Sequence, residues 1–416
     1  MKELVNNKLV FRNFFSLTLA QGINALLQLL VVPFVIIKIG IENFGLVAVA
    51  QVVMFLLSTL AEYGYGQTGS RSVAQNRTDT EKLSKLFYHS IYLRIILCSV
   101  GFFLLLLLSL IFSFIQQHFI LYALAFVFVP GQALLPSWFF QGMEKLQWMA
   151  AALLLSKILF VLLVFLFISR PDHTSLFIFF LGLGNIITAI AASVFIVNRY
   201  HLKALGCSLK EIKRLLIEGA PVTAANLTMN LMQYGNLFIL RLYSNDLMAG
   251  YFSVAERIYF AMKQVLTAFA QSIYPALCRI NSSQYKIYFK KTFLPFFWLM
   301  VAISAMAALF APSIIGFFIK EANTMSILIF RMFCIAVPVV CLNMPGALVL
   351  LATNQRERYF KIFAIGLFIN LLANLLFAPQ YYAMGTVAAV LITEVIITVL
   401  VSLSLFKYFH QNQLHY

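Results

Sequence analysis

The chain alternates long apolar runs with short polar connections from one end to the other. Twelve of these runs are long enough to cross a bilayer as helices, since roughly 20 apolar residues span its core. The expected spans lie at about residues 13–37, 44–66, 86–114, 119–140, 149–168, 174–197, 218–243, 249–278, 292–319, 324–353, 360–378 and 384–406. The pattern therefore predicts an all-α integral membrane protein.

The eighth expected span carries charges well inside its ends. Its polar positions recur at three- and four-residue steps and so share one helix face; that face comprises Ser253, Glu256, Phe260, Lys263, Thr267, Gln271 and Tyr274, with Arg257 beside it. A charge at the bilayer centre costs about 2.5–3.5 kcal/mol, so it normally faces protein or water. We expect this face to line a polar interior, and the alternative is a Glu256 pair with Lys263 or Arg257 that only joins helices.

Other spans also carry polar stripes. They comprise Gln21, Asn24 and Gln28 in the first span, Thr223, Asn226, Asn230, Gln233 and Arg241 in the seventh, Asn370 and Asn374 in the eleventh, and Thr393, Glu394 and Thr398 in the twelfth. Polar side chains are unfavourable against lipid, so these stripes face helices or water. A single Asn or Gln often only bonds a neighbouring helix, whereas stripes opening both halves of the chain favour the walls of one hydrated cavity.

Three further basic residues lie inside apolar runs. Arg94 and Arg331 are within about two turns of a span end, from which a long side chain can reach the headgroups. Lys157 is near mid-span and cannot easily do so. Lys157 and Arg331 join the residues of the stripes as cavity candidates.

The basic residues gather in every second connection. They occur at 2–12, 71–85, 145, 199–214, 279–291, 356–361 and 407, whereas the other connections offer only Lys38, Arg170, Lys320 and the nearby Arg241. The positive-inside rule then places both termini and all even connections in the cytoplasm.

The two halves resemble copies of each other. Shifted by 205 residues, Gln28 meets Gln233 and Gln51 meets Glu256, and the order of long and short connections repeats. Six spans return the chain to its starting side, so the copies are parallel and related by a pseudo-two-fold axis along the membrane normal. We expect six-helix lobes at residues 1–197 and 218–416, joined by a cytoplasmic segment at 198–217 whose SLKEIKRLLI stretch is amphipathic.

Composition narrows the class further. The chain is 62% hydrophobic and 11% charged, about half the charged fraction of a soluble protein. Its net charge of +16 could suggest nucleic acid, but the basic residues form short clusters between spans. The five cysteines and six histidines lack metal-ligand spacing, and no catalytic or ATP-binding motif occurs. We therefore expect no enzyme, no cofactor, no metal and no nucleic-acid partner.

Four stretches resemble one known family. PFVIIKIGIENFGLVAVAQ at 33–51, AEYGYGQTGSRSVAQ at 61–75, SWFFQGMEKLQW at 137–148 and AERIYFAMKQVLTAFAQSIYPALCRI at 255–280 are similar, in content and order, to bacterial O-antigen flippases. These are the Wzx-type translocases of the multidrug/oligosaccharidyl-lipid/polysaccharide (MOP) superfamily. The resemblance covers essentially the whole chain and is most specific in its first 150 residues.

The resemblance implies a function. A member turns an undecaprenyl-pyrophosphate-linked oligosaccharide from the cytoplasmic to the periplasmic leaflet of the bacterial inner membrane, by alternating access between two six-helix lobes. It works beside other O-antigen assembly proteins such as a polymerase and a chain-length regulator. In this chain Arg257 and Lys263 would offset the pyrophosphate charge. Glu256, Glu62 and Glu394 are the candidates for ion coupling.

Three other classes are weaker. A drug antiporter of the same superfamily prefers acidic cavity residues, whereas the intramembrane charge here is mostly basic. An O-antigen polymerase or membrane glycosyltransferase needs an external catalytic loop, and every external connection is short. A receptor or structural membrane protein does not explain intramembrane charges in both halves.

Overall fold

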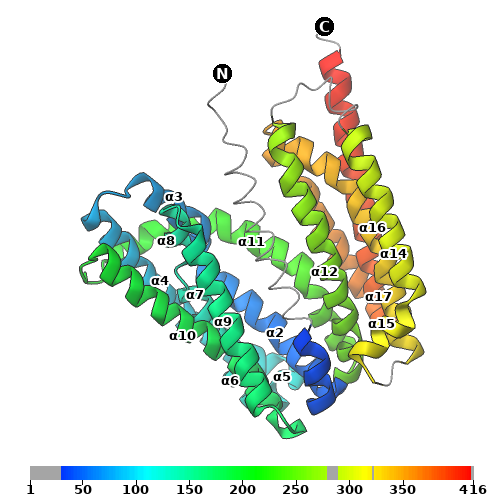
Figure 1. The fold of residues 1–416 in the computed structure, drawn as a ribbon, viewed down its shortest axis with the longest axis horizontal. Helices are drawn as coiled ribbons and strands as arrows, with labels where there is room; N and C mark the ends of the chain where they lie inside the picture. Colours follow the sequence, from blue (N-terminus) through cyan, green and yellow to red (C-terminus); the bar gives the residue numbers. More distant parts are fainter. Residues whose placement is uncertain (1–29, 279–288, 321–322, 414–416) are drawn as a thin grey trace. The chain divides into compact units, whose positions relative to one another are not determined.

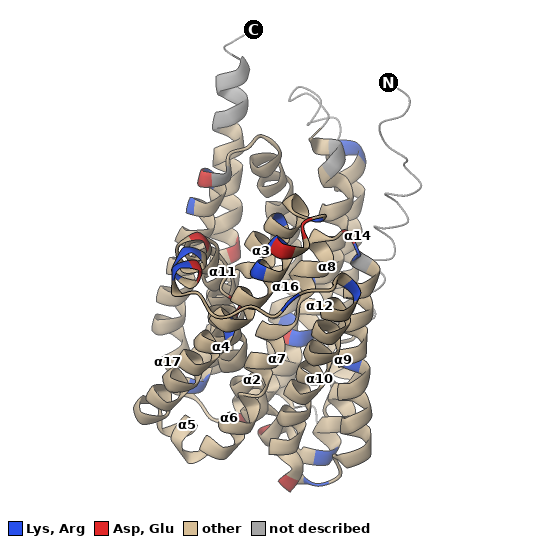
Figure 2. Cartoon of the chain, turned by 90° about the vertical axis from the view of Figure 1, so that its left-hand side faces the viewer, with Lys and Arg blue, Asp and Glu red and all other residues tan. Residues whose placement is uncertain are grey.

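The computed structural model describes residues 30–278, 289–320 and 323–413 (Figure 1). Helices, and no strands, make up the regular structure of these ranges. Eight stretches there are long and apolar enough to cross a membrane, and a shorter apolar helix covers Leu30–Ile39. The eight are Ile41–Gln75, Thr80–Ile111, Phe119–Gly142, Gln147–Phe167, Pro171–Tyr200, Phe289–Leu309, Thr324–Ala352 and Glu357–Phe406. Figure 2 shows how few charged residues lie along the helices. The predicted all-α integral membrane fold is confirmed.

The chain divides into two compact units, and the first unit is formed by Lys38–Gln233. Its helices are α2 (Ile41–Glu62), α3 (Tyr65–Gln75), α4 (Thr80–Ile111), α5 (Ser113–Gln117), α6 (Phe119–Ala125), α7 (Phe128–Leu134), α8 (Ser137–Gly142), α9 (Leu146–Phe167), the 3-10 turn η1 (Pro171–His173), α10 (Thr174–Tyr200) and the first part of α11 (Leu209–Tyr243). Helix α10 packs against α7 and α9, and α2 packs against α4 and α7.

The second unit comprises, in its described part, residues 30–37, 234–278, 289–320 and 323–413. Its described helices after the end of α11 are α12 (Asp246–Leu277), the π-helical turn η3 (Phe289–Phe293), α14 (Leu294–Leu309), α15 (Ala311–Phe318), α16 (Thr324–Ala352) and α17 (Arg356–Gln413). Helix α16 is central because α12, α14 and α17 all pack against it (Figure 1). The two units group residues by contact, so the lobe boundaries expected at 197 and 218 stay a prediction.

The second expected span is broken where α2 ends and α3 begins. Tyr63 and Gly64 have φ of 51° and 65°, and the Tyr63 N–H closes α2 by bonding to the carbonyl of Thr59. A Cβ at Gly64 would lie 2.8 Å from Val222, which is closer than side chains pack. Glycine is therefore required here both for the left-handed backbone and for the close approach of α11.

Breaks also shape two later spans. The stretch expected at 119–140 consists of α6, α7 and α8, with Pro130 in α7 and Pro136 preceding α8. Proline removes a backbone donor and permits such interruptions. Helix α17 contains one non-helical residue, Tyr382 (φ 49°, ψ −125°). This residue lies between the expected spans 360–378 and 384–406, so α17 contains both.

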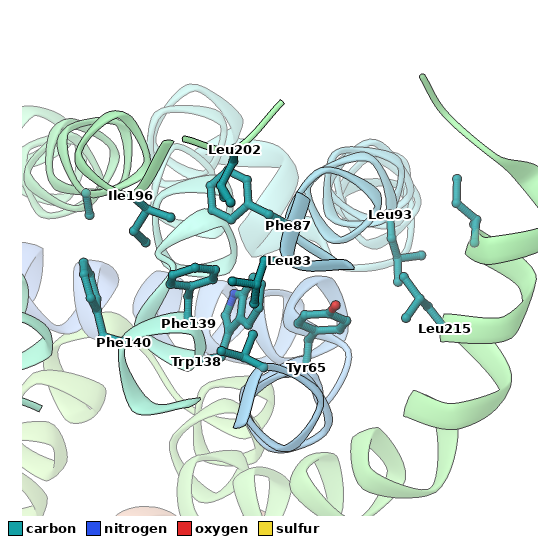
Figure 3. Close-up of a cluster of buried hydrophobic side chains, with 13 residues drawn as sticks. Tyr65, Leu83, Phe87, Leu93, Trp138, Phe139, Phe140, Ile196, Leu202 and Leu215 are labelled. Carbon is teal, nitrogen blue, oxygen red and sulfur yellow. The ribbon is translucent and has the colours of Figure 1, made fainter. Parts of the chain in front are cut away.

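An apolar cluster holds the broken span in place (Figure 3). The rings of Tyr65 and Trp138 meet edge to face with centroids 4.8 Å apart, and Phe87 and Phe139 extend the contact. These side chains come from α3, α4 and α8, and Leu215 at the start of α11 belongs to the same cluster. Burying aromatic rings of this size contributes most of the local packing energy.

The same turn follows α8 and α16. In one, Glu144 has φ 58° and the Lys145 N–H bonds to the Phe140 carbonyl at 2.8 Å; in the other, Asn354 has φ 60° and the Gln355 N–H bonds to Leu350 at 2.8 Å. Such a left-handed residue with a six-residue hydrogen bond ends a helix. The matching geometry supports the repeat that the sequence predicts. Around the first turn, Arg77 donates to Glu144 at 2.6 Å, a bond that lowers the pKa of that carboxyl.

Candidate functional site

Lys263 of α12 forms the centre of a charged group in the second unit. Its Nζ lies 3.8 Å from Oε1 of Glu394 on α17, and their side chains are 32% and 9% exposed. Asn343 of α16 donates from Nδ2 to Oε2 of the same carboxylate at 3.0 Å. Three helices thus bring together a cation, a carboxylate and an amide inside an apolar bundle.

Two aromatic residues of α12 also lie close to the Lys263 ammonium. Nζ of Lys263 lies 5.2 Å from the ring centroid of Tyr259 and 6.0 Å from that of Phe260. Tyr259 is buried, and its hydroxyl has no hydrogen-bond partner among the described residues. Cation–π contacts of this kind favour the charge where water is scarce.

Glu256 lies on the same helix and is only 6% exposed. Arg257 and Lys263 are the cations within electrostatic range of its carboxyl group. The carboxylate at salt-bridge distance from Lys263 is nevertheless Glu394. The pair of Glu256 with Lys263 or Arg257 that was considered from the sequence stays a prediction.

The stripes expected in the eleventh and twelfth spans meet in a buried hydrogen-bond chain, which also includes Asn236 of α11, a residue outside the predicted stripe of the seventh span. Asn374 Nδ2 donates to Oδ1 of Asn236 and to the carbonyl of Asn370, both at 2.9 Å. Asn370 in turn donates to Thr393 Oγ1 at 3.3 Å. All four are buried, so the chain joins α11 to the two halves of α17 within one unit.

The remaining amide candidates on α11 lie in the first unit, and Arg241 lies in the second. Asn230 donates to Oγ1 of Thr59 on α2 at 2.7 Å and is half-buried, as is Asn226. Gln233 is exposed. Arg241, at the end of the helix, makes a two-point ion pair with Asp246 through Nε at 2.6 Å and Nη2 at 3.1 Å. A paired guanidinium of this geometry fixes the connection to α12.

The isolated basic candidates differ in their surroundings. Lys157 is half-buried in α9, and no salt bridge to it occurs within the described ranges. Arg331 is exposed and donates from Nε to the Ala308 carbonyl at 3.2 Å. Their role in a cavity stays a prediction. Gln21, Asn24 and Gln28 lie outside the described residues.

Arg94 departs from the sequence-based expectation. It is 2% exposed, so its side chain does not reach toward a headgroup. Its guanidinium lies 4.9 Å from the ring centroid of Tyr65 and 5.5 Å from that of Trp138. Nε and Nη2 have no hydrogen-bond partner in the described part of the chain, and the half-buried Glu62 is the nearby carboxylate in electrostatic range. Sequence reasoning missed this aromatic enclosure because Tyr65 and Trp138 are far apart in the chain.

The groups described above contain few metal-ligating residues. In the described ranges, no three His, Cys, Asp or Glu side chains come close enough to hold a metal ion together. In the second unit, Lys263 is a partly exposed cation with two buried carboxylates, Glu256 and Glu394, in electrostatic range and the amide of Asn343 bonded to one of them. Such a set suits an anionic group flanked by hydroxyls.

Comparison with known proteins identifies the family. Residues 10–281 match the model of the family described as "Polysaccharide biosynthesis protein", well over half of the chain. The chain belongs to this family. The matched range of this polysaccharide biosynthesis protein ends just after α12, so it includes Glu256, Arg257 and Lys263.

Relatives cover nearly the whole length of this family member. It is 26% identical over 400 residues to the "Putative O-antigen transporter" of Escherichia coli (strain K12), covering 94% of this chain and 96% of the relative. The lipid II flippase MurJ in an inward closed conformation superposes with a TM-score of 0.70 at 14% identity, over 93% of this chain and 86% of MurJ. An inward-facing MATE family multidrug transporter of the MOP superfamily gives 0.66 at 15% identity, over 93% and 98%. The family and superfamily fold predicted from the sequence motifs are confirmed.

Proposed function

We propose that this protein is a flippase that moves a lipid-linked oligosaccharide across a bacterial inner membrane. Its substrate is an undecaprenyl-pyrophosphate-linked repeat unit of a surface polysaccharide, carried from the cytoplasmic to the periplasmic leaflet by alternating access. Both termini lie in the cytoplasm. The observation that carries the proposal is Lys263, a partly accessible cation inside a membrane helix of a polysaccharide biosynthesis protein.

The headgroup chemistry explains why a cation is needed. A pyrophosphate that leaves water loses its hydration, and a single unit charge 4 Å away returns about 4 kcal/mol at an effective dielectric of 20, against about 1 kcal/mol in water. Lys263 supplies such a charge, and Arg257 one position after Glu256 supplies a second. The aromatic contacts of Lys263 keep its ammonium in place without consuming its hydrogen-bond donors.

Amides supply the polar partners for sugar. Asn226, Asn230 and Gln233 occupy one stripe of α11, where carbonyl and amide groups can bond hydroxyls of either donor or acceptor character. Gln21, Asn24 and Gln28 extend the same proposal to the first span. Glu256, Glu62 and Glu394 are proposed as the groups through which an ion gradient drives the cycle.

The named relatives support this substrate class. The similarity to an O-antigen transporter over 94% of the chain favours a polysaccharide precursor, and MurJ is a flippase of a lipid-linked substrate with a related fold. Other assembly proteins, such as a polymerase and a chain-length regulator, are the expected partners in the cell.

The alternative function is a small-molecule antiporter. The MATE structures share the fold, and the buried Glu256 and Glu394 are what a cationic drug would need. An antiporter mutant would lose resistance to cationic drugs but keep its surface polysaccharide.

Deletion of the gene tests the proposal. We expect surface polysaccharide to be lost while lipid-linked repeat units accumulate on the cytoplasmic leaflet, where an impermeant glycosidase added to spheroplasts cannot reach them. Single repeat units attached to lipid A would point to a polymerase and end the flippase proposal. Normal polysaccharide with lowered drug resistance would favour the antiporter.

A further inference from the structure

The cation proposed to meet the headgroup already faces a carboxylate. Glu394 is almost fully enclosed, whereas Lys263 keeps about a third of its side chain exposed. Their separation of 3.8 Å exceeds the 2.7–2.9 Å typical of a direct charge-assisted hydrogen bond. The pair is therefore attractive but open, and the ammonium keeps donors for another anion.

Each partner has a second contact of its own. Asn343 on α16 holds Glu394 by its second oxygen at 3.0 Å. The Tyr259 and Phe260 rings on α12 hold the ammonium at 5.2 and 6.0 Å. Among the described residues, the Asn343 amide is the hydrogen-bond donor to the Glu394 side chain, so its removal would let the carboxylate move closer to Lys263.

We infer that Glu394 is an internal counter-ion, which a phosphate-bearing headgroup displaces from Lys263 on entry and which displaces that headgroup on release. Asn343 sets how strongly it competes. The inference rests on the proposed function and assigns its regulation to residues that do not touch the substrate themselves. A tethered carboxylate competes at a high effective concentration, so it can expel a headgroup that would otherwise remain on the cation.

The counter-ion makes two variants act in opposite directions. Glu394→Gln removes the competing charge but keeps the shape and one acceptor for Asn343. The anion should then bind more tightly and leave more slowly. Asn343→Leu frees the carboxylate to close on Lys263, so the anion should bind more weakly. A purely structural role for the pair would lower the abundance of both variants and shift neither affinity in a specific direction.

The experiment measures binding to the purified full-length protein. Geranylgeranyl pyrophosphate and inorganic pyrophosphate are titrated in parallel by calorimetry. We expect the Kd of both probes to fall about three- to tenfold in Glu394→Gln and to rise by a similar factor in Asn343→Leu, the range that partly buried ion pairs contribute. Export in cells should fall in Glu394→Gln despite the tighter binding, because release becomes slow.

Two controls complete the test. Glu357→Gln removes a carboxylate that lies 2.7 Å from Lys361 on an exposed stretch of α17, and should leave both Kd values unchanged. In a Lys263→Gln background, Glu394→Gln should have no further effect on binding. Wild-type binding with no change in either variant overturns the inference and leaves the flippase standing. A response of the prenylated probe alone also overturns it, and failure of the wild type to bind either probe overturns both proposals.

Discussion

Glu144 and Asn354 adopt the same left-handed backbone conformation at matching turns of the two halves, with φ of 58° and 60°. Each follows a helix whose last carbonyls are closed by the same hydrogen bonds. The left-handed conformation costs an L-residue roughly 1–2 kcal/mol, and the cost is smaller for Asn because of its short polar side chain. The turn is thus a local structural requirement that the repeat preserves with different residues.

Substitutions at Asn354 should reveal that requirement. We expect Asn354→Gly to be more stable than Asn354→Val by about 1–2 kcal/mol, because only glycine enters the left-handed region without strain. Thermal unfolding of the detergent-purified protein measures the difference. The same two substitutions at the exposed helical Ser402 should reverse the order, since glycine weakens a helix. Equal stability of the two Asn354 variants would contradict the turn geometry.

Cys207 offers a direct check of orientation. It is exposed in the segment between α10 and α11, whereas Cys98, Cys334 and Cys341 are buried. If that segment is cytoplasmic, a membrane-impermeant maleimide should label Cys207 in inverted vesicles and not in intact cells. The exposed Cys278 is replaced by serine in the same protein to leave one accessible thiol. Labelling from outside the cell would reverse the predicted topology.

Lys263 should be needed for export more than for folding. We expect Lys263→Ala to abolish export at near-normal abundance, and Lys263→Arg to keep part of it because the charge remains while the compact ammonium is lost. Immunoblotting and surface-polysaccharide staining measure the two quantities. The neutral double variant Glu394→Gln with Lys263→Met removes the whole pair, and normal export by it would show that the pair only joins helices.

Arg94 should behave in the opposite way. Its buried guanidinium lacks hydrogen-bond partners for Nε and Nη2 in the described residues, and aromatic contacts together with the charge of Glu62 offset part of its desolvation. Replacing such a group by an apolar side chain of similar length is often neutral or stabilising. Arg94→Met should therefore raise the free energy of unfolding by about 1 kcal/mol, with export lowered if the charge has a role in the cycle. A loss of more than about 2 kcal/mol would show that the guanidinium has a partner in the membrane.

Local sequence patterns predict most of the spans, because a membrane helix satisfies its own backbone and is recognisable by its length and hydropathy. Helices α11 and α12 are less apolar than the others. The breaks within the spans are harder to predict. Gly64 indicates one of them, but the positive φ angles of Tyr63 and Tyr382 depend on tertiary contacts that the local sequence does not show. Among candidate residues, helical spacing predicts the polar face that contains Lys263 and the polar stripe with Asn370 and Asn374, but it does not include Asn236. It could not identify Glu394 as the carboxylate beside Lys263, or Asn343 as its amide. These two contacts depend on which turns of α12, α16 and α17 lie next to one another. That alignment is set by the packing of segments that are far apart in the sequence.

Helices α11 and α12 are absent from the stretches apolar enough to cross a membrane by themselves. Polar side chains through their middles, including Asn226, Asn230, Glu256 and Lys263, account for this. A nascent helix of such composition gains too little from lipid to remain there alone, with each central charge adding about 2.5–3.5 kcal/mol to the cost of insertion. We therefore expect α11 and α12 to insert into the bilayer together with other helices. The apolar helices synthesised before them would provide a protein surface for their polar side chains. The residues that we propose to meet a charged headgroup thus also constrain how these helices are inserted into the membrane.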